Sequence, residues 1–325
     1  MKEVTVAVYS SSKELPSCEG KVFFHSSELF RIYENTPRHS PMMAVARRSD
    51  GTVAGHILAV VRRRSMWLPP FMSWHCRILG EGEYDVVESE RQMLFGKLME
   101  ALVRKMPIRV SYIELSHQSS KMFGYSILRG LGFFPVNWMN IHNSLHSKSP
   151  EERASERTLT RIKSAMKKGV ETREVKNERD FHEFMSLLKA HNYFKPKRFI
   201  PDDAFFRDIA RTGVGKLILT NYKSTTIGCC AYAVSNNNSY LWYAGFLRKR
   251  YKKCYPAEVT IWAAIKKSYN EGIDHFCFLD VGLPYRANKL RDFILKFGGK
   301  PVSSFRWFRF NNKMLNALIS TIWGQ

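Results

Sequence analysis

The hydrophobic positions of this chain change their period repeatedly, from every second residue to every third or fourth and back. Valines at alternate positions of 4–8 are typical of a strand with one buried face. The following stretch FFHSSELFRIYENT, residues 23–36, has apolar residues at helical spacing after a pair of serines that can cap the first turn. Two apolar runs then meet at Asp50-Gly51, a dipeptide typical of two-residue hairpins. The pattern predicts a strand, a helix and a hairpin in this order.

The first half of the chain continues with elements of the same kinds. A loop rich in proline and aromatic residues, 66–74, precedes a helical pattern at 88–104 with leucines and a methionine on one face. The strand-like stretch VSYIEL, 110–115, comes next, and residues 120–132 form another helical pattern that ends at a glycine. An extended segment closes this half before residue 150.

The same order of elements recurs in the second half. The predicted elements are a helix at 179–194, three strands within 215–247, a helix from Pro256 to the glycine at 272, a strand at 275–281, a helix at 287–299 and a last strand at 302–310. Two halves with one order of elements indicate an internal duplication. We therefore predict two domains, 1–150 and 151–325.

The stretch LTRIKSAMKKGVETREV, residues 159–175, lies at the junction of the two predicted domains. Apolar residues at positions i, i+3 and i+7 from Leu159 share one face of a helix that ends at a glycine. The remaining face is basic and includes Arg161 and Lys168. This helix opens the second domain, and its charged face is either a solvated surface or an anion-binding one.

Charge narrows the range of partners. The 325 residues include 51 Lys or Arg and 29 Asp or Glu, which gives a formal net charge of +22. Such an excess attracts polyanions such as tRNA, nucleotide diphosphates or anionic lipid headgroups, but it does not choose among them.

The cysteine spacing indicates whether the chain binds a metal, and the length of its apolar runs indicates where the protein is located in the cell. The six cysteines lack CxxC spacing and nearby histidines, so we expect reduced thiols and no metal. The first residues lack the apolar core of a signal peptide, and no apolar run is long enough to span a bilayer. We expect a soluble protein of the cytoplasm, or one at the inner face of the membrane.

Several groups of residues share their order and spacing with one known family. They are FFHSSELF with SDGTVAGHILAV, TLTRIKSAMKKGVETREV at the domain junction, and SYLWYAGFL, IWAAIKKSYNEGIDHFCFLDVG and LRDFILKFGGKP in the second half. Together they resemble the Fem family of peptidoglycan-bridge aminoacyl transferases. The resemblance implies an α/β (α+β) fold of two tandem GNAT-like acetyltransferase domains, with mixed central sheets flanked by helices.

The resemblance also implies an activity. It predicts an N-acyltransferase that moves an aminoacyl group from aminoacyl-tRNA to an amine of a cell-wall or cell-envelope precursor, nucleotide- or lipid-linked. Members commonly have Phe-Lys ahead of a Phe-Gly-Gly, whereas here Ile294 follows Phe293 and the nearest base is Lys296. An acyl-CoA donor in polysaccharide biosynthesis and a non-catalytic RNA-binding protein on the same fold therefore stay open. Beyond acyl-CoA as a donor substrate, no cofactor is expected.

Donor phosphates are expected at a loop that precedes a helix N-terminus. The link FLRKRYKKCYPAEV lacks the Arg/Gln-x-x-Gly-x-Gly/Ala pattern of ordinary acetyl-CoA enzymes and carries a cluster of cations instead. These cations are Arg248, Lys249, Arg250, Lys252 and Lys253. We expect a large anion there, and tRNA suits the cluster better than CoA; a solvated basic loop is the alternative.

Candidate catalytic residues come from strands near this link. Tyr240, Trp242 and Tyr243 are expected to alternate along a strand, so that Tyr243 points away from the other two and one face lines a cleft. Asp280 ends an apolar strand and is suited to take the amine proton, and Glu114 has a comparable place in the first domain. Asp280 and Tyr243 are the predicted catalytic residues, and the predicted substrate-binding residues are Tyr240, Trp242, Arg161, Lys168, Arg286, Lys289 and Arg291. Aromatic packing, helix capping and surface solvation are the alternatives for these residues.

Other chemistry lacks its usual sequence support. No GxSxG, Walker, HExxH or GxGxxG pattern occurs. The stretch KMLNALISTIWGQ, 313–325, has apolar residues on one helical face, which predicts either packing against the body or peripheral contact with a membrane surface. The pattern makes no prediction about the oligomeric state.

Overall fold

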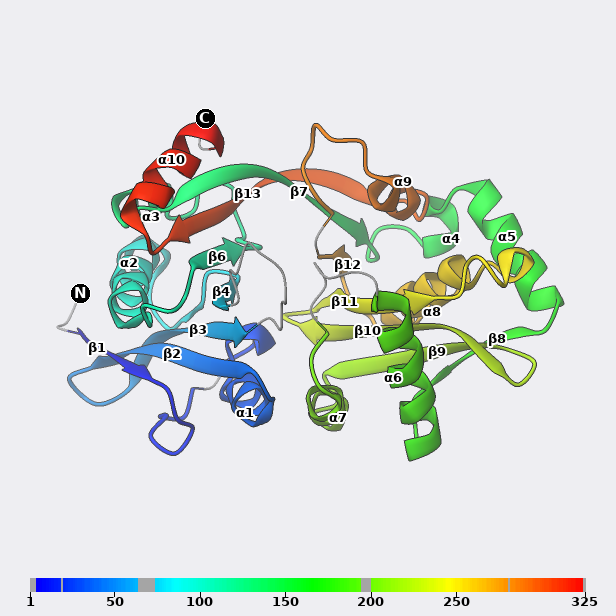
Figure 1. Ribbon diagram of the computed structural model, residues 1–325, viewed down its shortest axis with the longest axis horizontal. Coiled ribbons are helices and arrows are strands. Elements are labelled where there is room, and N and C mark those ends of the chain that lie inside the picture. The colour runs from blue at the N-terminus through cyan, green and yellow to red at the C-terminus, as the bar shows by residue number, and fades with distance from the viewer. Residues whose placement is uncertain (1–3, 19, 64–73, 194–199, 280, 324–325) are drawn as a thin grey trace. The chain divides into compact units, whose positions relative to one another are not determined.

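The structure of the protein is a computed structural model that describes residues 4–18, 20–63, 74–193, 200–279 and 281–323 (Figure 1). Its backbone contacts group the chain into two compact units. The first unit comprises Met1–Trp138 with Ser303–Gln325, and the second comprises Met139–Val302. Each unit contains a β-sheet with helices, which is the mixed α/β architecture that the sequence predicted.

The first unit is built around a mixed sheet with the strand order β1-β2-β3-β4-β6-β13-β7, and β5 pairs with β3. Strands β4 and β6 are parallel, whereas β1–β2, β2–β3, β3–β4 and β6–β13 are antiparallel. The strands are β1 (Val4–Tyr9), β2 (His39–Arg48), β3 (Val53–Arg63), β4 (Trp74–Leu79), β5 (Glu83–Tyr84), β6 (Tyr112–Ser116), β7 (Phe134–Ser144) and β13 (Lys300–Phe310). The helices are η1 (Phe23–His25), α1 (Ser27–Asn35), α2 (Glu88–Lys105), α3 (Tyr125–Gly130) and α10 (Lys313–Trp323).

Helix α2 supplies much of the core of the first unit. Leu94, Leu98 and Leu102 recur at every fourth residue, and all three are buried against apolar side chains of the sheet. Trp307 of β13 is fully buried in the same cluster. The leucines of the stripe predicted at 88–104 thus pack on the sheet, whereas Met93, predicted on the same face, is 46% exposed.

A buried histidine fixes the chain ahead of the first α-helix. The Nδ1 atom of His25 lies 3.0 Å from the backbone nitrogen of Leu58, and its Nε2 atom lies 3.1 Å from the backbone nitrogen of Gly82. Ser26 accepts a hydrogen bond from the backbone N–H of Leu29 and caps α1. The Phe-His-Ser motif of the Fem-like pattern therefore has a structural role in this chain.

The second unit has the strand order β7-β12-β11-β10-β9-β8. Strands β11 and β12 are parallel, and the pairs β7–β12, β10–β11, β9–β10 and β8–β9 are antiparallel. The strands besides β7 are β8 (Val170–Glu174), β9 (Gly215–Tyr222), β10 (Thr225–Ser235), β11 (Asn238–Phe246) and β12 (His275–Phe278). The helices are α4 (Pro150–Arg153), α5 (Glu156–Lys167), α6 (Glu178–Asn192), α7 (Asp203–Arg211), η2 (Lys252–Cys254), α8 (Pro256–Asn270) and α9 (Lys289–Leu295).

Helices cover both faces of the sheet in the second unit. A Cβ atom added at Gly228 of β10 would meet Thr260 of α8, so this face packs on α8. A Cβ atom added at Gly245 of β11 would meet Leu188 and His191 of α6, so the other face packs on α6. Figure 1 shows α6 and α8 on opposite sides of β9, β10 and β11.

The contacts divide the chain differently from the two consecutive domains, 1–150 and 151–325, that the sequence suggested. Strand β13 pairs with β6 from Trp307↔Leu115 to Phe310↔Tyr112, so the last residues of the chain group with the first unit. Strands β7 and β13 both contribute residues to each unit. The predicted basic helix is present as α5, and it is followed by β8 as expected.

The cysteine side chains form no disulfide. All six are free thiols, five of them are buried, and Cys277 is half-buried. Burial raises the pKa of Cys76 and of Cys277 to about 12. These thiols are therefore protonated at neutral pH, as expected for side chains that fill a core.

The Phe-Gly-Gly sequence at the end of α9 is fixed by close backbone packing. Gly298 has a φ of +85°, and a Cβ atom there would lie 2.5 Å from the Cβ atom of Arg153. We expect Gly298→Ala to lower the free energy of unfolding by about 1–3 kcal/mol, because both the backbone conformation and the contact become strained. Urea unfolding followed by circular dichroism measures this change.

Gly130→Ala is the matched control, since a Cβ atom added at Gly130 of α3 meets nothing within 4 Å. Alanine there should raise stability by about 0.5–1 kcal/mol, as in other helices. Equal effects of the two substitutions would contradict the packing assigned to Gly298.

Stability should fall as the pH is lowered below about 6.5, the ordinary pKa of histidine. Burial lowers the pKa of His25 to about 3 and that of His39 to about 4. The unfolded chain therefore binds protons more readily than the folded chain between pH 6.5 and pH 3, and the stability contributed by these neutral side chains is lost progressively across that window. Urea titrations at several pH values should show this loss. His25→Gln should make the pH dependence shallower, whereas the substitution His182→Gln at an exposed position of α6 should leave it unchanged.

Candidate functional site

The link between β11 and α8 forms an exposed cationic segment. The side chains of Arg248, Lys249, Arg250, Lys252 and Lys253 are all exposed, and Cys254 after them is buried. Helix α8 begins at Pro256 without a side-chain hydrogen bond to cap its first turn. The positive end of the helix dipole thus lies directly behind five cations, an arrangement that favours an anion.

Arg248 connects this segment to α9. Its guanidinium carbon lies 5.3 Å from the ring centre of Phe246 and 4.5 Å from that of Phe293. Desolvation lowers the pKa of Arg248 and the Glu258 carboxylate opposes this shift, but an arginine remains charged at neutral pH. The cation is thereby held at a defined place between β11 and α9.

The structure brings Arg161 and Lys168 of the basic joining helix to the same segment. The Nζ atom of Lys168 lies 3.2 Å from the carbonyl oxygen of Lys253. Arg161 lies 3.4 Å from a carboxylate oxygen of Glu258 and over the ring of Tyr255, at 5.4 Å. The exposed face of α5 continues the cationic surface with Arg157, Lys163 and Lys167.

Strand β11 continues past the end of its parallel partner β12 toward this cationic segment. Strands β11 and β12 pair from Asn238↔His275 to Leu241↔Phe278, where β12 ends. In the described part of the chain, β12 ends there, whereas β11 continues to Phe246. At the end of β11, Nδ1 of His191 lies 3.1 Å from the backbone nitrogen and 3.0 Å from the carbonyl oxygen of Phe246.

The predicted alternation of the β11 aromatic residues is wrong, because a β-bulge interrupts the strand. The register with β10 steps from Ala231↔Tyr243 to Tyr232↔Leu241 and leaves Trp242 as the extra residue. Trp242 and Tyr243 consequently stack on each other, with ring centres 5.9 Å apart. Both rings pack against α7, where their contacts are Phe205–Trp242 at 5.4 Å and Phe206–Tyr243 at 5.1 Å.

Tyr240 lies near the splay of the two parallel strands. Its register partner on β12 is Cys277, and burial raises the pKa of Tyr240 above the ordinary range of tyrosine. The phenol is therefore neutral at physiological pH. The roles predicted for Tyr240, Trp242 and Tyr243 in substrate contact and catalysis remain predictions.

The two carboxylates named from the sequence have different outcomes. Asp280 lies outside the described residues, so its role stays a prediction. Glu114 on β6 is buried, and its carboxylate lies 3.5 Å from Arg77 and 3.2 Å from Arg306. The Arg306 guanidinium in turn lies 3.9 Å from the ring centre of Trp138. Glu114 is thus held between two guanidinium groups as an ion pair of the first unit.

Of the three cations that follow Asp280 in the sequence, Arg291 is bonded to the backbone, and the other two are exposed. Arg291 donates hydrogen bonds to the backbone carbonyl oxygens of Leu283, Pro284 and Arg286, at 2.8–3.3 Å, and so fixes the turn ahead of α9. The side chains of Arg286 and Lys289 are exposed on the same segment. Their proposed contact with a substrate remains a prediction.

Ile294 is part of the core. Its side chain is 3% exposed and packs in the apolar cluster of the second unit, whereas Phe293 before it faces Arg248. Lys296, the nearest base, is exposed, and its carbonyl oxygen accepts a hydrogen bond from the backbone N–H of Ser155. The position where family members have a lysine is therefore apolar and buried in this chain.

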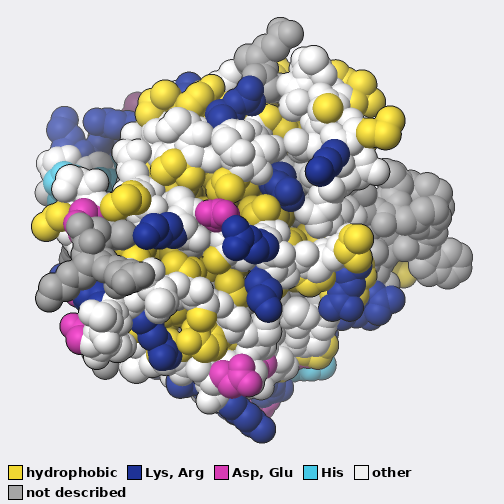
Figure 2. Space-filling view, turned by 90° about the vertical axis from the view of Figure 1, so that its left-hand side faces the viewer, with side chains coloured by type: hydrophobic (Ala, Val, Ile, Leu, Met, Phe, Trp, Pro, Cys, Tyr) yellow, Lys and Arg dark blue, Asp and Glu magenta, His cyan; other side chains and the backbone are white. Residues whose placement is uncertain are grey.

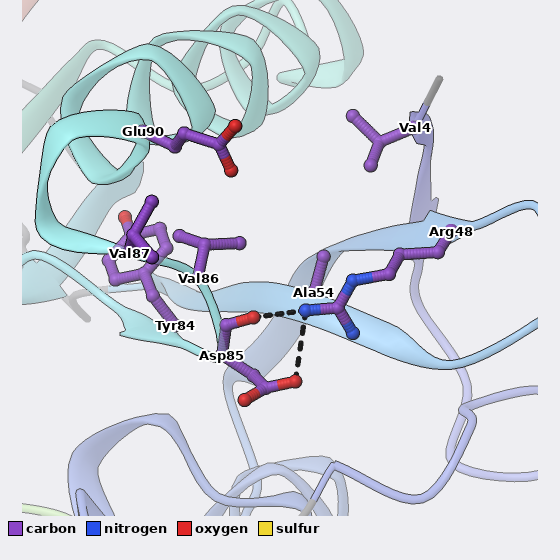
Figure 3. Close-up of a pocket in the computed structure, with 8 residues that line it drawn as sticks. All are labelled: Val4, Arg48, Ala54, Tyr84, Asp85, Val86, Val87 and Glu90. Atoms are coloured by element: carbon purple, nitrogen blue, oxygen red, sulfur yellow. Dashed lines mark hydrogen bonds and ion pairs between the residues drawn. The ribbon is translucent and has the colours of Figure 1, made fainter. Parts of the chain in front are cut away.

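The corresponding link of the first unit has the opposite charge. A hollow of about 510 Å³ lies where β5 leads into α2, and Figure 3 shows Arg48 pointing across it to Asp85. Arg48 Nη2 lies 2.9 Å from the Asp85 carboxylate, and Glu88 and Glu90 occupy the first turn of α2. These carboxylates already complement the helix dipole, so this link repels phosphate.

Among the residues that the structure describes, no group of histidine, cysteine or carboxylate side chains could hold a metal ion.

Comparison with known proteins identifies the fold. Residues 156–287 match the profile of the acetyltransferase (GNAT) domain family. No curated protein sequence matches the chain. Among solved structures, FemX superposes with a TM-score of 0.62 and 11% identity over 97% of this chain and 96% of its own. L-PGS from Bacillus licheniformis gives a TM-score of 0.58 and 10% identity, with 92% of each chain covered.

A third solved structure shares the tandem arrangement. The tandem GNAT protein from the clavulanic acid biosynthesis pathway gives a TM-score of 0.52 and 10% identity over 95% of this chain and 99% of its own. Likenesses at this identity establish the fold. Residues 156–287, within the second unit, are thus similar to a GNAT domain, and the chain as a whole shares the fold of FemX and of the tandem GNAT protein, as its sequence motifs predicted.

Proposed function

We propose that the protein is an aminoacyltransferase that moves an aminoacyl group from aminoacyl-tRNA to an amine of a cell-envelope precursor. The observation that carries this proposal is the cationic link ahead of α8, together with the basic face of α5 beside it. An aminoacyl-tRNA would place its phosphates along these cations and its aminoacyl end near residues 242–246 of β11, beyond the end of β12. The precursor would be nucleotide- or lipid-linked and would be met at the cytoplasmic face of the membrane.

The distribution of the cations favours a polynucleotide donor over CoA. The link offers no glycine-rich turn whose backbone N–H groups could cradle a pyrophosphate. It offers long side chains instead, and the exposed cations of α5 add to them. Successive phosphates of a nucleic acid are neutralised by such an extended basic surface.

The reaction itself is a simple acyl transfer. The acceptor amine, once neutral, attacks the carbonyl carbon of the aminoacyl ester; an amide C–N bond forms as the ester C–O bond breaks. The proton lost by the amine ends on the hydroxyl of the leaving tRNA terminus, so no other co-reactant is needed. In this proposal Asp280 takes the amine proton, and Tyr243 with Tyr240 and Trp242 lines the acceptor side. Positioning of the two reactants supplies most of the rate enhancement.

The first unit would bind the acceptor substrate and not a second donor. Its link carries Asp85, Glu88 and Glu90 where the second unit has cations, which disfavours a polyanion. Only the second unit matches the GNAT profile. The proposal therefore places one donor site in the chain, in the second unit.

Discharge of charged tRNA tests the proposed reaction. A mixed pool of charged bacterial tRNAs should lose one amino acid when the purified protein and a peptidoglycan precursor extract are both present. Tyr243→Phe should lower the initial rate of discharge by at least about tenfold, as for loss of an interaction made at the reacting groups, without altering the circular dichroism spectrum. Wild-type rates in this variant would remove Tyr243 from the site.

The same assay separates the alternatives. Discharge that does not depend on the precursor, or none at all in a folded preparation, would contradict aminoacyl transfer. Turnover of acyl-CoA with the same precursor would then assign a CoA donor. Binding that fails to distinguish charged from uncharged tRNA, without turnover of either donor, would indicate an RNA-binding protein.

Removal of two link cations tests where the donor binds. Arg250→Gln combined with Lys253→Gln should weaken tRNA binding, and the slope of log K against log salt should shrink by about one for each lost phosphate contact. Filter binding at several salt concentrations measures both quantities. Lys97→Gln on the exposed face of α2 serves as the control, and it should leave both unchanged. An equal effect of both variants would show that only net charge matters.

A further inference from the structure

The helix α10 of the first unit exposes an apolar surface that the proposed transfer does not use. Six of its eleven residues are large and apolar, and its only charged residue is Lys313. None of the eleven is buried. Met314, Leu318 and Ile322 are 85%, 62% and 66% exposed.

The apolar side chains form a broad strip along the helix. Met314, Leu318 and Ile322 follow one another at every fourth residue and form its outer edge. Leu315 and Trp323, eight residues apart, lie further round at 37% and 38% exposed. At about 100° per residue the six apolar residues cover roughly half of the helix circumference. The other half carries small and polar side chains.

The base of α10 is fixed to the first unit, so the strip is presented in one orientation. The side-chain oxygen of Asn312 accepts a hydrogen bond from the backbone N–H of Leu315, at 2.9 Å, and caps the helix. Asn316 accepts from the backbone N–H of Phe310 at 2.8 Å and donates to the carbonyl oxygen of Gly132 at 3.0 Å. The helix is therefore anchored through its first turn and exposed beyond it.

A second apolar side chain lies beside that base. Ile108, in the turn between α2 and β6, is 97% exposed. The turn is tied to the start of α10 by Asn311, whose side-chain amide lies 2.7 Å from the carbonyl oxygen of Val110. Exposed Lys105 and Arg109 flank Ile108 in the sequence. Apolar and cationic side chains are thus combined at one place.

The surrounding chain is strongly basic. Segments 104–138 and 303–325 contain eight lysines and arginines and a single acidic residue, Glu114. Glu114 is buried in its ion pair with Arg77 and Arg306. No carboxylate side chain of these segments is therefore exposed. Figure 2 shows hydrophobic side chains interspersed with lysines and arginines on this side of the first unit, with fewer Asp and Glu side chains among them.

We propose that α10, together with Ile108, is a docking surface for an anionic phospholipid bilayer. Met314, Leu318 and Ile322 enter the boundary between headgroups and acyl chains, and Trp323 lies at the level of the headgroups, where indole rings are favoured. Lys105, Arg109 and Lys313 neutralise headgroup phosphates.

The surface fits a lipid better than a protein partner. It is convex and carries no exposed acid or other charged group on its apolar half that would select one protein sequence. Its charge complements an anionic lipid surface. No helix in the described part of the chain is long and apolar enough to cross a membrane, so the contact would be peripheral. The proposal does not depend on the transfer reaction, since α10 and Ile108 belong to the first unit and the proposed donor-binding cations to the second.

Vesicle sedimentation of the full chain tests the proposal. The protein should sediment with sucrose-loaded vesicles that contain phosphatidylglycerol and much less with vesicles of phosphatidylcholine alone. Leu318→Asp combined with Ile322→Asp should lower the partition coefficient by at least about tenfold, because two apolar side chains are replaced by anions. Val87→Asp combined with Met93→Asp is the control, as it adds the same charge at exposed apolar positions of the α2 region.

The possible results distinguish a lipid bilayer from a second copy of the chain as the partner of this surface. Failure of the wild-type protein to bind the anionic vesicles, or equal loss in both double variants, would overturn the proposal. Light scattering on a sizing column tests for a second copy: a dimer that Leu318→Asp with Ile322→Asp converts to monomer would assign the surface to self-association and also overturn it. The tRNA discharge rate in the absence of membranes should stay at the wild-type level in the same variant. Loss of vesicle binding alone thus separates this proposal from the proposed function.

Discussion

Strands β11 and β12 are paired over a short stretch only, and the candidate site depends on this limit. Pairing stops at Leu241↔Phe278, and β11 continues for five more residues beyond it. The bulge at Trp242 adds twist at the point where the pairing ends, which turns both Trp242 and Tyr243 toward α7. Trp242, Tyr243 and the cationic link ahead of α8 all follow this point along the chain.

The elements with strong periodicity were predictable from the sequence, and those set by long-range contacts were not. The stripe Leu94, Leu98, Leu102 and the basic helix α5 were identified correctly, because their apolar positions match one helix period. Helix α7 was not predicted, although its capping Asp202 and the buried pair Phe205 and Phe206 carried a signal for it. The pairing of β13 with β6 leaves no local signal, since it joins residues almost two hundred positions apart.

The site could be predicted in its charges but not in its geometry. Clustered lysines and arginines are visible in any sequence, and the link 248–253 is indeed exposed, with Arg161 and Lys168 beside it. A bulge, in contrast, shifts every later side chain by one position, so the alternation expected for Tyr240, Trp242 and Tyr243 failed. Arg291 resembled a substrate ligand in the sequence, yet its guanidinium is bonded to three backbone carbonyl groups. The charge of a side chain can be read from the sequence, whereas the direction in which it points depends on the fold.

The burial of the cysteines gives the protein a practical property. Alkylating reagents attack thiolates, and burial raises the pKa of Cys76 and Cys277 to about 12, while the other four thiols are buried as well. A maleimide would therefore react slowly with the folded native chain. One cysteine introduced on the outer edge of α10 or on the link ahead of α8 would then carry a fluorophore selectively, and all six native thiols could stay in place.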